Sequence, residues 1–250
     1  MLIVAAAAVV LLLNGGSGTK LAGYVNAQVN QTQIAALQSI AMNTTLASSV
    51  GSGVVYPYPT PITGKNVTTV GGKPALIFVG ADYCPYCALT RWGMIIALMR
   101  FGNFQQLHYM LSSPSDVFRN TATFTFYNSS YSSDYIAFLP VEVANRSGAP
   151  LGQLDQLQGA AAAAYDTGES VPFIDFGNQS VQVGIPRSIT PQTLSGMNWA
   201  QIIALLGSPG STVSQTIIGQ ANVFTAQICR MDNYTPASVC GQQYVKSIIG

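Results

Sequence analysis

The chain has 250 residues, of which 48% are hydrophobic and only 8% are charged, and its net charge is +1. An average soluble domain carries about 25% charged residues. The near-neutral balance gives no electrostatic reason to expect nucleic acid or a strongly acidic partner. The length suits one large domain, or one domain with extensions.

The first segment along the chain, residues 1–18, predicts a signal or anchor. Leu2 to Leu13 is an unbroken run of 12 apolar residues, followed by asparagine, serine and glycines. This is shorter than the roughly 20 residues that span a bilayer, so it fits a signal-peptide core or the surviving part of an anchor. We therefore expect an extracytoplasmic chain, secreted or attached to the membrane through its N-terminus.

Sequons for N-glycosylation (Asn-x-Ser/Thr) favour the same location. They begin at Asn30, Asn43, Asn66, Asn128, Asn145, Asn178 and Asn233. Such sites belong on the surface of exported proteins, although a surface rich in Ser, Thr and Asn also produces them incidentally. The sequence therefore predicts a cell-surface or secreted glycoprotein.

Residues 19–72 predict an N-terminal helix followed by a linker. The apolar spacing over Thr19–Ala47 is helical, and this helix could serve as a stalk between a membrane and the domain. Gly51–Gly72 is rich in turn residues, and the prolines of Tyr56–Pro61 force extended backbone. We interpret this second stretch as a linker or a wrapping segment.

Residues 73–250 predict one α/β domain with a C-terminal helical extension. The expected strands are Lys73–Gly80, Leu107–Leu111, Phe124–Tyr127, Ile136–Val143, Pro172–Phe176 and Ser180–Gly184. The expected helices are Cys84–Arg100, Leu151–Tyr165, Pro191–Leu206, Thr212–Cys229 and Ala237–Ile249.

The motif Cys84-Pro85-Tyr86-Cys87 follows the first of these strands and opens the first of these helices. Two cysteines at this spacing, at a strand-to-helix junction, are typical of a thiol–disulfide redox centre. Free backbone N–H groups and the helix dipole favour a thiolate on the first cysteine. We therefore predict Cys84, exposed at the helix start, as the nucleophile and Cys87 as the resolving thiol. Pro85 and Tyr86 would tune how well the N–H groups solvate the thiolate.

A structural disulfide and half of a zinc site are the alternatives for this motif. A structural zinc ion needs four ligands. The chain has four cysteines and one histidine, but Cys229 and Cys240 have ten residues between them and do not form a zinc knuckle. We expect no metal site and no cofactor besides the dithiol. His108, the only histidine, is expected to be a satisfied core or edge residue rather than a catalytic one.

The stretch Val171-Pro172-Phe173-Ile174-Asp175-Phe176, together with the CxxC motif, resembles the thioredoxin superfamily. The resemblance implies a cis-proline at Pro172 opposite the cysteines, with Val171 placed to pair with an extended substrate. An ordinary trans proline that opens an edge strand is the alternative. The implied fold is thioredoxin-like, with an insertion after the second core strand, an N-terminal helix and a C-terminal helical extension.

Two features depart from the thioredoxin pattern. Tyr83 precedes the first cysteine where tryptophan is usual, and Ala75–Gly80 contains no acidic residue. Asp82 is expected to be exposed on the motif loop, so Asp82 or water would have to accept the proton of Cys87. Tyr83 and Tyr86 are expected to be packing groups that also share an apolar docking surface for substrate.

The C-terminal stretches Gly219–Cys229 and Pro236–Cys240 resemble an archaeal family catalogued as domain of unknown function 929. That resemblance extends from about Lys73 to the C-terminus and implies a thioredoxin-like fold and redox character, but no substrate. Cys229 and Cys240 would lie in adjacent helices, where a disulfide would stabilise the fold by roughly 2–3 kcal/mol. A second dithiol that relays electrons is the alternative.

Together these features predict an exported thiol–disulfide oxidoreductase. It would form, reduce or isomerise disulfides in other exported proteins and exchange electrons with a membrane redox partner. One alternative is a non-enzymatic glycosylated cell-surface module, for binding or structure, with both cysteine pairs as stapling disulfides. The other is a Cu(I) carrier, because soft thiolates select that ion.

Overall fold

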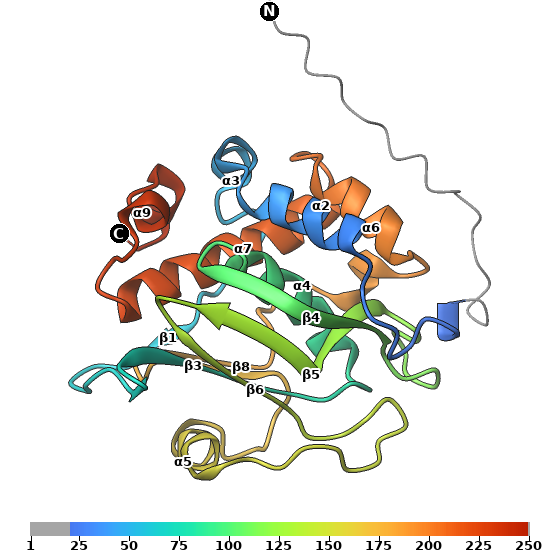
Figure 1. Cartoon of the computed structure of the whole chain (residues 1–250), viewed down its shortest axis with the longest axis horizontal. Helices are drawn as coiled ribbons and strands as arrows, with labels where there is room; N and C mark the ends of the chain where they lie inside the picture. Colours follow the sequence, from blue (N-terminus) through green and yellow to red (C-terminus); the bar gives the residue numbers. More distant parts are fainter. Residues whose placement is uncertain (1–20, 250) are drawn as a thin grey trace, which may run out of the picture.

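The computed structural model describes residues 21–249 (Figure 1). The predicted signal or anchor segment, residues 1–18, lies outside the described residues. Within the described part, no helix has both the length and the apolar character that crossing a membrane requires.

The centre of the fold is a mixed sheet in the order β1–β8–β7–β3–β2, with β6 also paired to β3. Its strands are β1 (Thr60–Pro61), β2 (Thr69–Val70), β3 (Lys73–Gly80), β6 (Ala137–Glu142), β7 (Phe173–Phe176) and β8 (Ser180–Val183). β3 runs parallel to β6 and antiparallel to β7. The predicted bounds of β3 are confirmed, and its burial follows because it has neighbours along both edges.

Alternate residues of β3 supply two separate cores, as the two-residue period of a strand requires. Leu76 and Phe78 pack into the larger core, whereas Ile77 and Val79 face a smaller one. α5 (Gln156–Tyr165) covers the smaller core, while α4 (Pro85–Leu98) and α7 (Thr212–Met231) cover the larger one (Figure 1). The chain is therefore a layered α/β fold with helices on both faces of the sheet.

A second, two-stranded sheet lies apart from the first. β4 (Gly102–Leu111) and β5 (Ala122–Ser133) pair antiparallel with each other. β5 extends beyond the predicted strand Phe124–Tyr127, and its residues 130–133 pair with the beginning of β4. The prediction took Leu107–Leu111 as the core strand that follows β3 and placed the insertion after it. The core strand that follows β3, and runs parallel to it, is β6. The inserted hairpin β4–β5 therefore comes before this strand, not after it as predicted. An apolar pattern identifies a strand but does not identify its partner, which explains this error.

The predicted N-terminal helix is wrong in its extent. It is divided into α2 (Gln31–Ala41) and α3 (Thr44–Val50), because Asn30 and Asn43 each accept a backbone N–H bond as the cap of a new helix. Leu37 and Leu46 on these helices are buried in the larger core. The two helices therefore belong to the packed body and do not form a stalk.

The remaining helices complete the layer over the larger core. They are η1 (Pro191–Leu194), α6 (Trp199–Leu206), α8 (Ala237–Cys240) and α9 (Gln243–Ile249). The predicted helix 191–206 is interrupted because Asn198 forms a capping box with Gln201 and starts α6 anew. Most of α7 is buried, as a helix surrounded by other elements must be.

Candidate functional site

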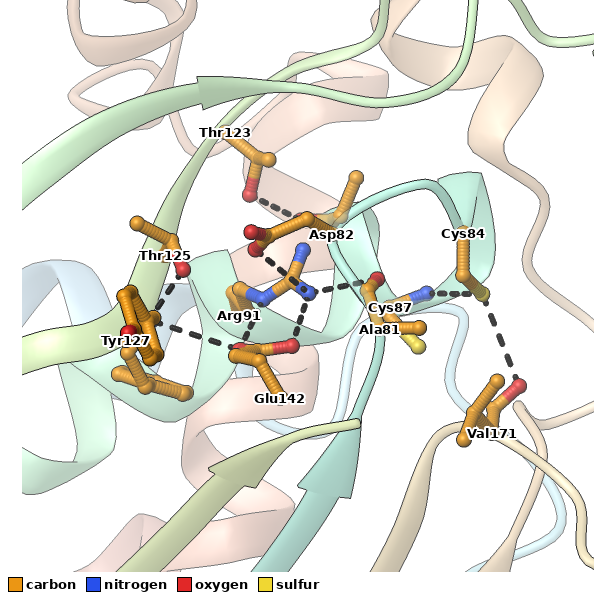
Figure 2. Close-up of polar contacts among 12 residues, drawn as sticks. Ala81, Asp82, Cys84, Cys87, Arg91, Thr123, Thr125, Tyr127, Glu142 and Val171 are labelled. Atoms are coloured by element: carbon orange, nitrogen blue, oxygen red, sulfur yellow. Dashed lines mark hydrogen bonds and ion pairs between the residues drawn. The ribbon is translucent and has the colours of Figure 1, made fainter. Parts of the chain in front are cut away.

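The CxxC motif opens α4, and Cys84 is the residue that caps it. Cys84 has extended backbone, and its Sγ accepts the backbone N–H of Cys87 at 3.1 Å (Figure 2). Pro85 occupies the first turn, where a helix needs no N–H donor. The helix therefore starts at the motif because of these residues, and it aims its free N–H groups at the Cys84 sulfur.

The predicted cis-proline lies beside the first cysteine. The Val171–Pro172 peptide bond is cis. The Cys84 thiol donates to the Val171 carbonyl oxygen at 3.6 Å (Figure 2). Residues 87 positions apart in the sequence thus meet at the carboxyl end of β3.

Both sulfurs of the motif are covered, which corrects the expectation of an exposed Cys84. Cys84 is 4% exposed and Cys87 is fully buried, and both cysteines are free. The cover comes from Ala144, Val143 and Val171, which pack against them. The Cys84 sulfur is therefore almost inaccessible in this arrangement.

The surroundings push the two thiol pKa values apart. The Cys87 thiol and the backbone N–H groups of Cys87 and Tyr86 bond to the Cys84 sulfur and lower its pKa, against the opposing effect of burial. Burial raises the pKa of Cys87, and so does its bond to Cys84. Cys84 is therefore the thiol that ionises first.

Beneath the cysteines lies a buried charge cluster that the sequence analysis missed. Arg91 of α4 donates to both carboxylate oxygens of Glu142, through Nε at 2.9 Å and Nη2 at 2.6 Å (Figure 2). It also donates to the Ala81 carbonyl at 2.8 Å. Asp82 lies 3.7 Å from the same nitrogen. An arginine inside an apolar helix and a glutamate at the end of an apolar strand are seldom buried without partners. Their positions in apolar segments are therefore the feature of the sequence that indicates a buried ion pair.

The charge cluster also corrects the position of Asp82, which is 2% exposed rather than on the surface. Its carboxylate turns inward because Arg91 attracts it. Burial raises the pKa of Asp82 and of Glu142, while Arg91 opposes the shift in both. Of the two, Glu142 also contributes to the raised pKa of Cys87. The charges of the cluster therefore lie close enough to Cys87 to affect its pKa.

The two tyrosines next to the motif cysteines form part of the surface around the CxxC motif. Tyr83 and Tyr86 are both exposed. The Tyr86 ring meets Phe118 edge-on at 6.0 Å, and the Tyr83 carbonyl accepts the N–H of Ser113 at 2.8 Å. The loop between β4 and β5 therefore packs beside the motif, and its Val117 adds an exposed apolar side chain.

A cavity of about 490 Å³ adjoins the cis-proline loop on the other side. Val171 and Phe173 line it together with apolar residues of β3 and of the α5 region, and the polar segment Asp166–Ser170 lines the remaining part. Leu154 at this cavity is 40% exposed. Exposed apolar and aromatic side chains therefore lie on both sides of the motif, at the β4–β5 loop and at this cavity.

The C-terminal cysteines lie elsewhere in the fold. Cys229 of α7 and Cys240 of α8 are joined by a disulfide, and both are buried. Within residues 21–249 no group of three or more His, Cys, Asp and Glu side chains is placed to hold a metal ion. His108 is half-buried in β4, outside the core, which fits the edge position that was one of the two predictions; its Nδ1 has no hydrogen-bond partner among the described residues, so it is not fully satisfied.

The sequon asparagines divide by exposure. Five are exposed, namely Asn30, Asn43, Asn66, Asn128 and Asn233. Asn145 and Asn178 are half-buried. The side-chain amide nitrogen, to which a glycan would attach, donates a hydrogen bond in Asn178, to the Asn66 carbonyl at 3.3 Å, and in Asn30, to the Tyr109 hydroxyl at 3.0 Å.

Comparison with known proteins gives one match. No curated protein and no solved structure matches the chain. The family model of a domain of unknown function (DUF929) matches residues 60–163. That segment contains the CxxC motif and the buried Arg91 cluster, whereas Pro172 and the C-terminal disulfide lie beyond it.

Proposed function

We propose that the chain is an exported thiol–disulfide oxidoreductase with a thioredoxin-like core. The strand order supports this core: β6, β3, β7 and β8 lie side by side, with β6 parallel and β7 antiparallel to β3. The CxxC helix follows the central strand, and the cis-proline precedes β7. Fold alone does not carry function, so the cysteine geometry is the main support.

The observation that carries the proposal is the difference between the two thiols. Cys84 receives N–H groups at a helix N-terminus, which lower its pKa, whereas Cys87 is buried with a raised pKa. A nucleophile needs a thiolate, and a resolving thiol must stay protonated until the mixed disulfide forms. The pair has this division of roles before any substrate arrives.

The reaction is a two-electron exchange between dithiol and disulfide. The Cys84 thiolate attacks one sulfur of a substrate disulfide, forms a mixed disulfide and releases a substrate thiolate, which takes up a proton. Cys87 then loses its proton and attacks the Cys84 sulfur, and the second substrate thiolate leaves. The enzyme is now oxidised and the substrate has two thiols. The reverse sequence inserts a disulfide into a substrate.

Several surfaces suit a polypeptide substrate. The Val171 backbone next to Cys84 is placed to pair with an extended chain. Tyr83 and Tyr86 are exposed on the motif, and the 490 Å³ cavity adjoins Val171, whereas Pro85 is buried and leaves substrate contact to its neighbours. These surfaces favour an apolar stretch of chain around the target cysteine.

The exported location rests on the N-terminal apolar segment and the sequons. The Cys229–Cys240 disulfide is in keeping with an oxidising compartment. The proposed partners are exported proteins with thiols or disulfides, and a membrane redox protein that restores the dithiol or disulfide.

The test is the reduction potential of Cys84–Cys87, measured by equilibration with glutathione or dithiothreitol, acid quenching and mass spectrometry of the peptide that contains both cysteines. The C-terminal disulfide lies in another peptide and serves as the internal control. A value of about −120 to −180 mV indicates an oxidase or isomerase, and one near −270 mV a reductase. A value below about −300 mV marks a structural disulfide and rejects the proposal. The burial of both sulfurs favours that alternative.

A further inference from the structure

The cavity of about 490 Å³ beside the cis-proline loop shares two of its lining residues with the surroundings of the cysteines. Val143 and Val171 line the cavity, and the same two side chains pack against the cluster that contains Cys84 and Cys87. The Cys84 thiol also bonds to the Val171 carbonyl, as Figure 2 shows. A substrate chain that pairs with the Val171 backbone to reach Cys84 therefore runs along the edge of this cavity.

The cavity combines apolar walls with two carboxylates. The strands β3 and β7 and the helix α5 supply apolar walls through Val79, Phe173 and Ala162. The segment between α5 and the cis-proline supplies Asp166 and Glu169. The described residues that line the cavity include no lysine, arginine or histidine. A positively charged group that enters the cavity therefore meets opposite charges and no like charge.

Asp166 is the residue that points most directly to a ligand. It lines the cavity and is only 6% exposed. Its carboxylate has neither a hydrogen-bond donor nor a cation as a partner among the described residues, yet its oxygens are not closed off from the solvent. An aspartate is seldom buried to this degree without a partner, because it is costly to remove a charged group from water. The Asp166 carboxylate is therefore available to a cationic group from outside the chain.

The end of α5 adds to the negative potential of the cavity. Asp166 is the C-cap of this helix, and the carbonyl groups of the last helical turn carry a partial negative charge. Ala162 and Ala163 of that turn line the cavity. The helix terminus and the two carboxylates thus act in the same direction, since each of them favours a cation and opposes an anion.

We propose that this cavity selects substrate chains that carry a lysine or an arginine within two residues of the target cysteine. The proposal rests on the proposed function, because the exchange at Cys84 is what brings such a chain to Val171. A strand advances about 3.3 Å per residue, so a long side chain one or two residues from the cysteine reaches the cavity. Its methylene groups pack on the apolar walls, as the stems of these side chains usually do, and its charged end meets Asp166 and Glu169.

The test measures peptide binding without any exchange chemistry. Short fluorescent peptides with serine at the target position carry lysine, norleucine, alanine or glutamate two residues before or after that serine. Norleucine has a stem like that of lysine but no charge. Fluorescence anisotropy with the reduced full chain should give a dissociation constant about tenfold lower for lysine than for norleucine in at least one of the two positions, because a hydrogen bond to a charged group is worth about that factor. Norleucine should bind more tightly than alanine, and glutamate should bind most weakly.

Variants connect this preference to the cavity. Asp166→Asn should reduce the preference for lysine over norleucine to less than about twofold, because it removes the charge-assisted bond. Asp134→Asn makes the same change of charge at an exposed position outside the cavity, and it should leave the preference unchanged. Gly159 lines the cavity, and a Cβ atom added there meets no atom within 4 Å. Gly159→Leu should therefore fill part of the cavity and weaken the binding of the lysine and norleucine peptides, but not of the alanine peptide.

Three results would overturn the inference. The first is that no peptide binds, or that lysine binds no more tightly than norleucine in either position. The second is a lysine preference that Asp166→Asn leaves unchanged. The third, which applies even if Asp166→Asn does not fold, is equal binding of the lysine peptide by Gly159→Leu and by the wild type. The serine peptides need no thiol, so this outcome is separate from the reduction potential of Cys84–Cys87. A potential below about −300 mV rejects the proposed function, whereas the loss of lysine preference rejects only the role of the cavity.

Discussion

Glutamine in place of Glu142 should strongly destabilise the protein. Glu142 is fully buried and receives two bonds from Arg91, at 2.9 and 2.6 Å. Glu142→Gln keeps the shape but leaves the Arg91 charge buried with only Asp82, at 3.7 Å, as a partner. Breaking a buried ion pair costs about 3–5 kcal/mol, and the remaining Asp82 favours the lower end. At about 2–4 °C per kcal/mol for a chain of this size, Tm should fall by about 6–20 °C.

The assay is thermal and urea unfolding followed by circular dichroism, in three proteins besides the wild type. Glu169→Gln is the matched control, because Glu169 is exposed and its change should stay within about 0.5 kcal/mol. The double variant Arg91→Met/Glu142→Leu removes both charges of this ion pair and should recover part of the loss, because the Asp82 carboxyl that remains can stay protonated when Arg91 no longer opposes the rise of its pKa by burial. A loss below about 1 kcal/mol in Glu142→Gln, or a double variant no more stable than the single one, would refute the reasoning.

Three further predictions follow from other groups. In the reduced protein, iodoacetamide should label Cys84, and the pH dependence of that labelling should give Cys84 a pKa below the ordinary value of about 8.5. Cys87 should stay unlabelled at neutral pH, which mass spectrometry can check. Labelling in the opposite order would contradict the thiol assignment. Burial raises the pKa of Asp175 to about 6, so the folded protein should lose stability as the pH rises from about 4 to 6. Urea unfolding should therefore show Asp175→Asn to be as stable as the wild type at pH 4, and more stable than the wild type at pH 7 by up to about 3 kcal/mol. If variant and wild type are equally stable at both pH values, the prediction fails. The double variant Cys229→Ala/Cys240→Ala removes the disulfide, whose cysteines are 11 positions apart, and should lower the free energy of unfolding by about 3 kcal/mol. The Tm should then fall by about 6–12 °C, and an unchanged Tm would disprove the prediction.

The local parts of the fold could be predicted because their signals are local. The bounds of β3 follow from one apolar run, and the start of α4 follows from a cysteine and a proline next to each other. The hairpin β7–β8 follows from the Gly177-Asn178 turn, where both residues have positive φ. Each of these depends on residues within a few positions.

The charge cluster and the hairpin could not be predicted in the same way. Glu142 and Arg91 are 51 positions apart, so neither indicates the other in the sequence. Asp82 looked like a loop residue because its partner belongs to the next helix. Helical spacing continues past Asn43 and predicts one helix through it, although its side chain starts α3. The common cause is that long-range partners decide burial and side-chain orientation.

The central strand has a consequence for how the chain is made. Ile77 of β3 pairs with Leu139 and with Asp175, which come 62 and 98 residues later. At a synthesis rate of about 5–20 residues per second, one edge of this apolar strand waits roughly 5–20 seconds for its partner. During that time the strand is a site for mispairing with other chains. Nascent molecules would therefore depend on a chaperone to cover that strand until β7 is made.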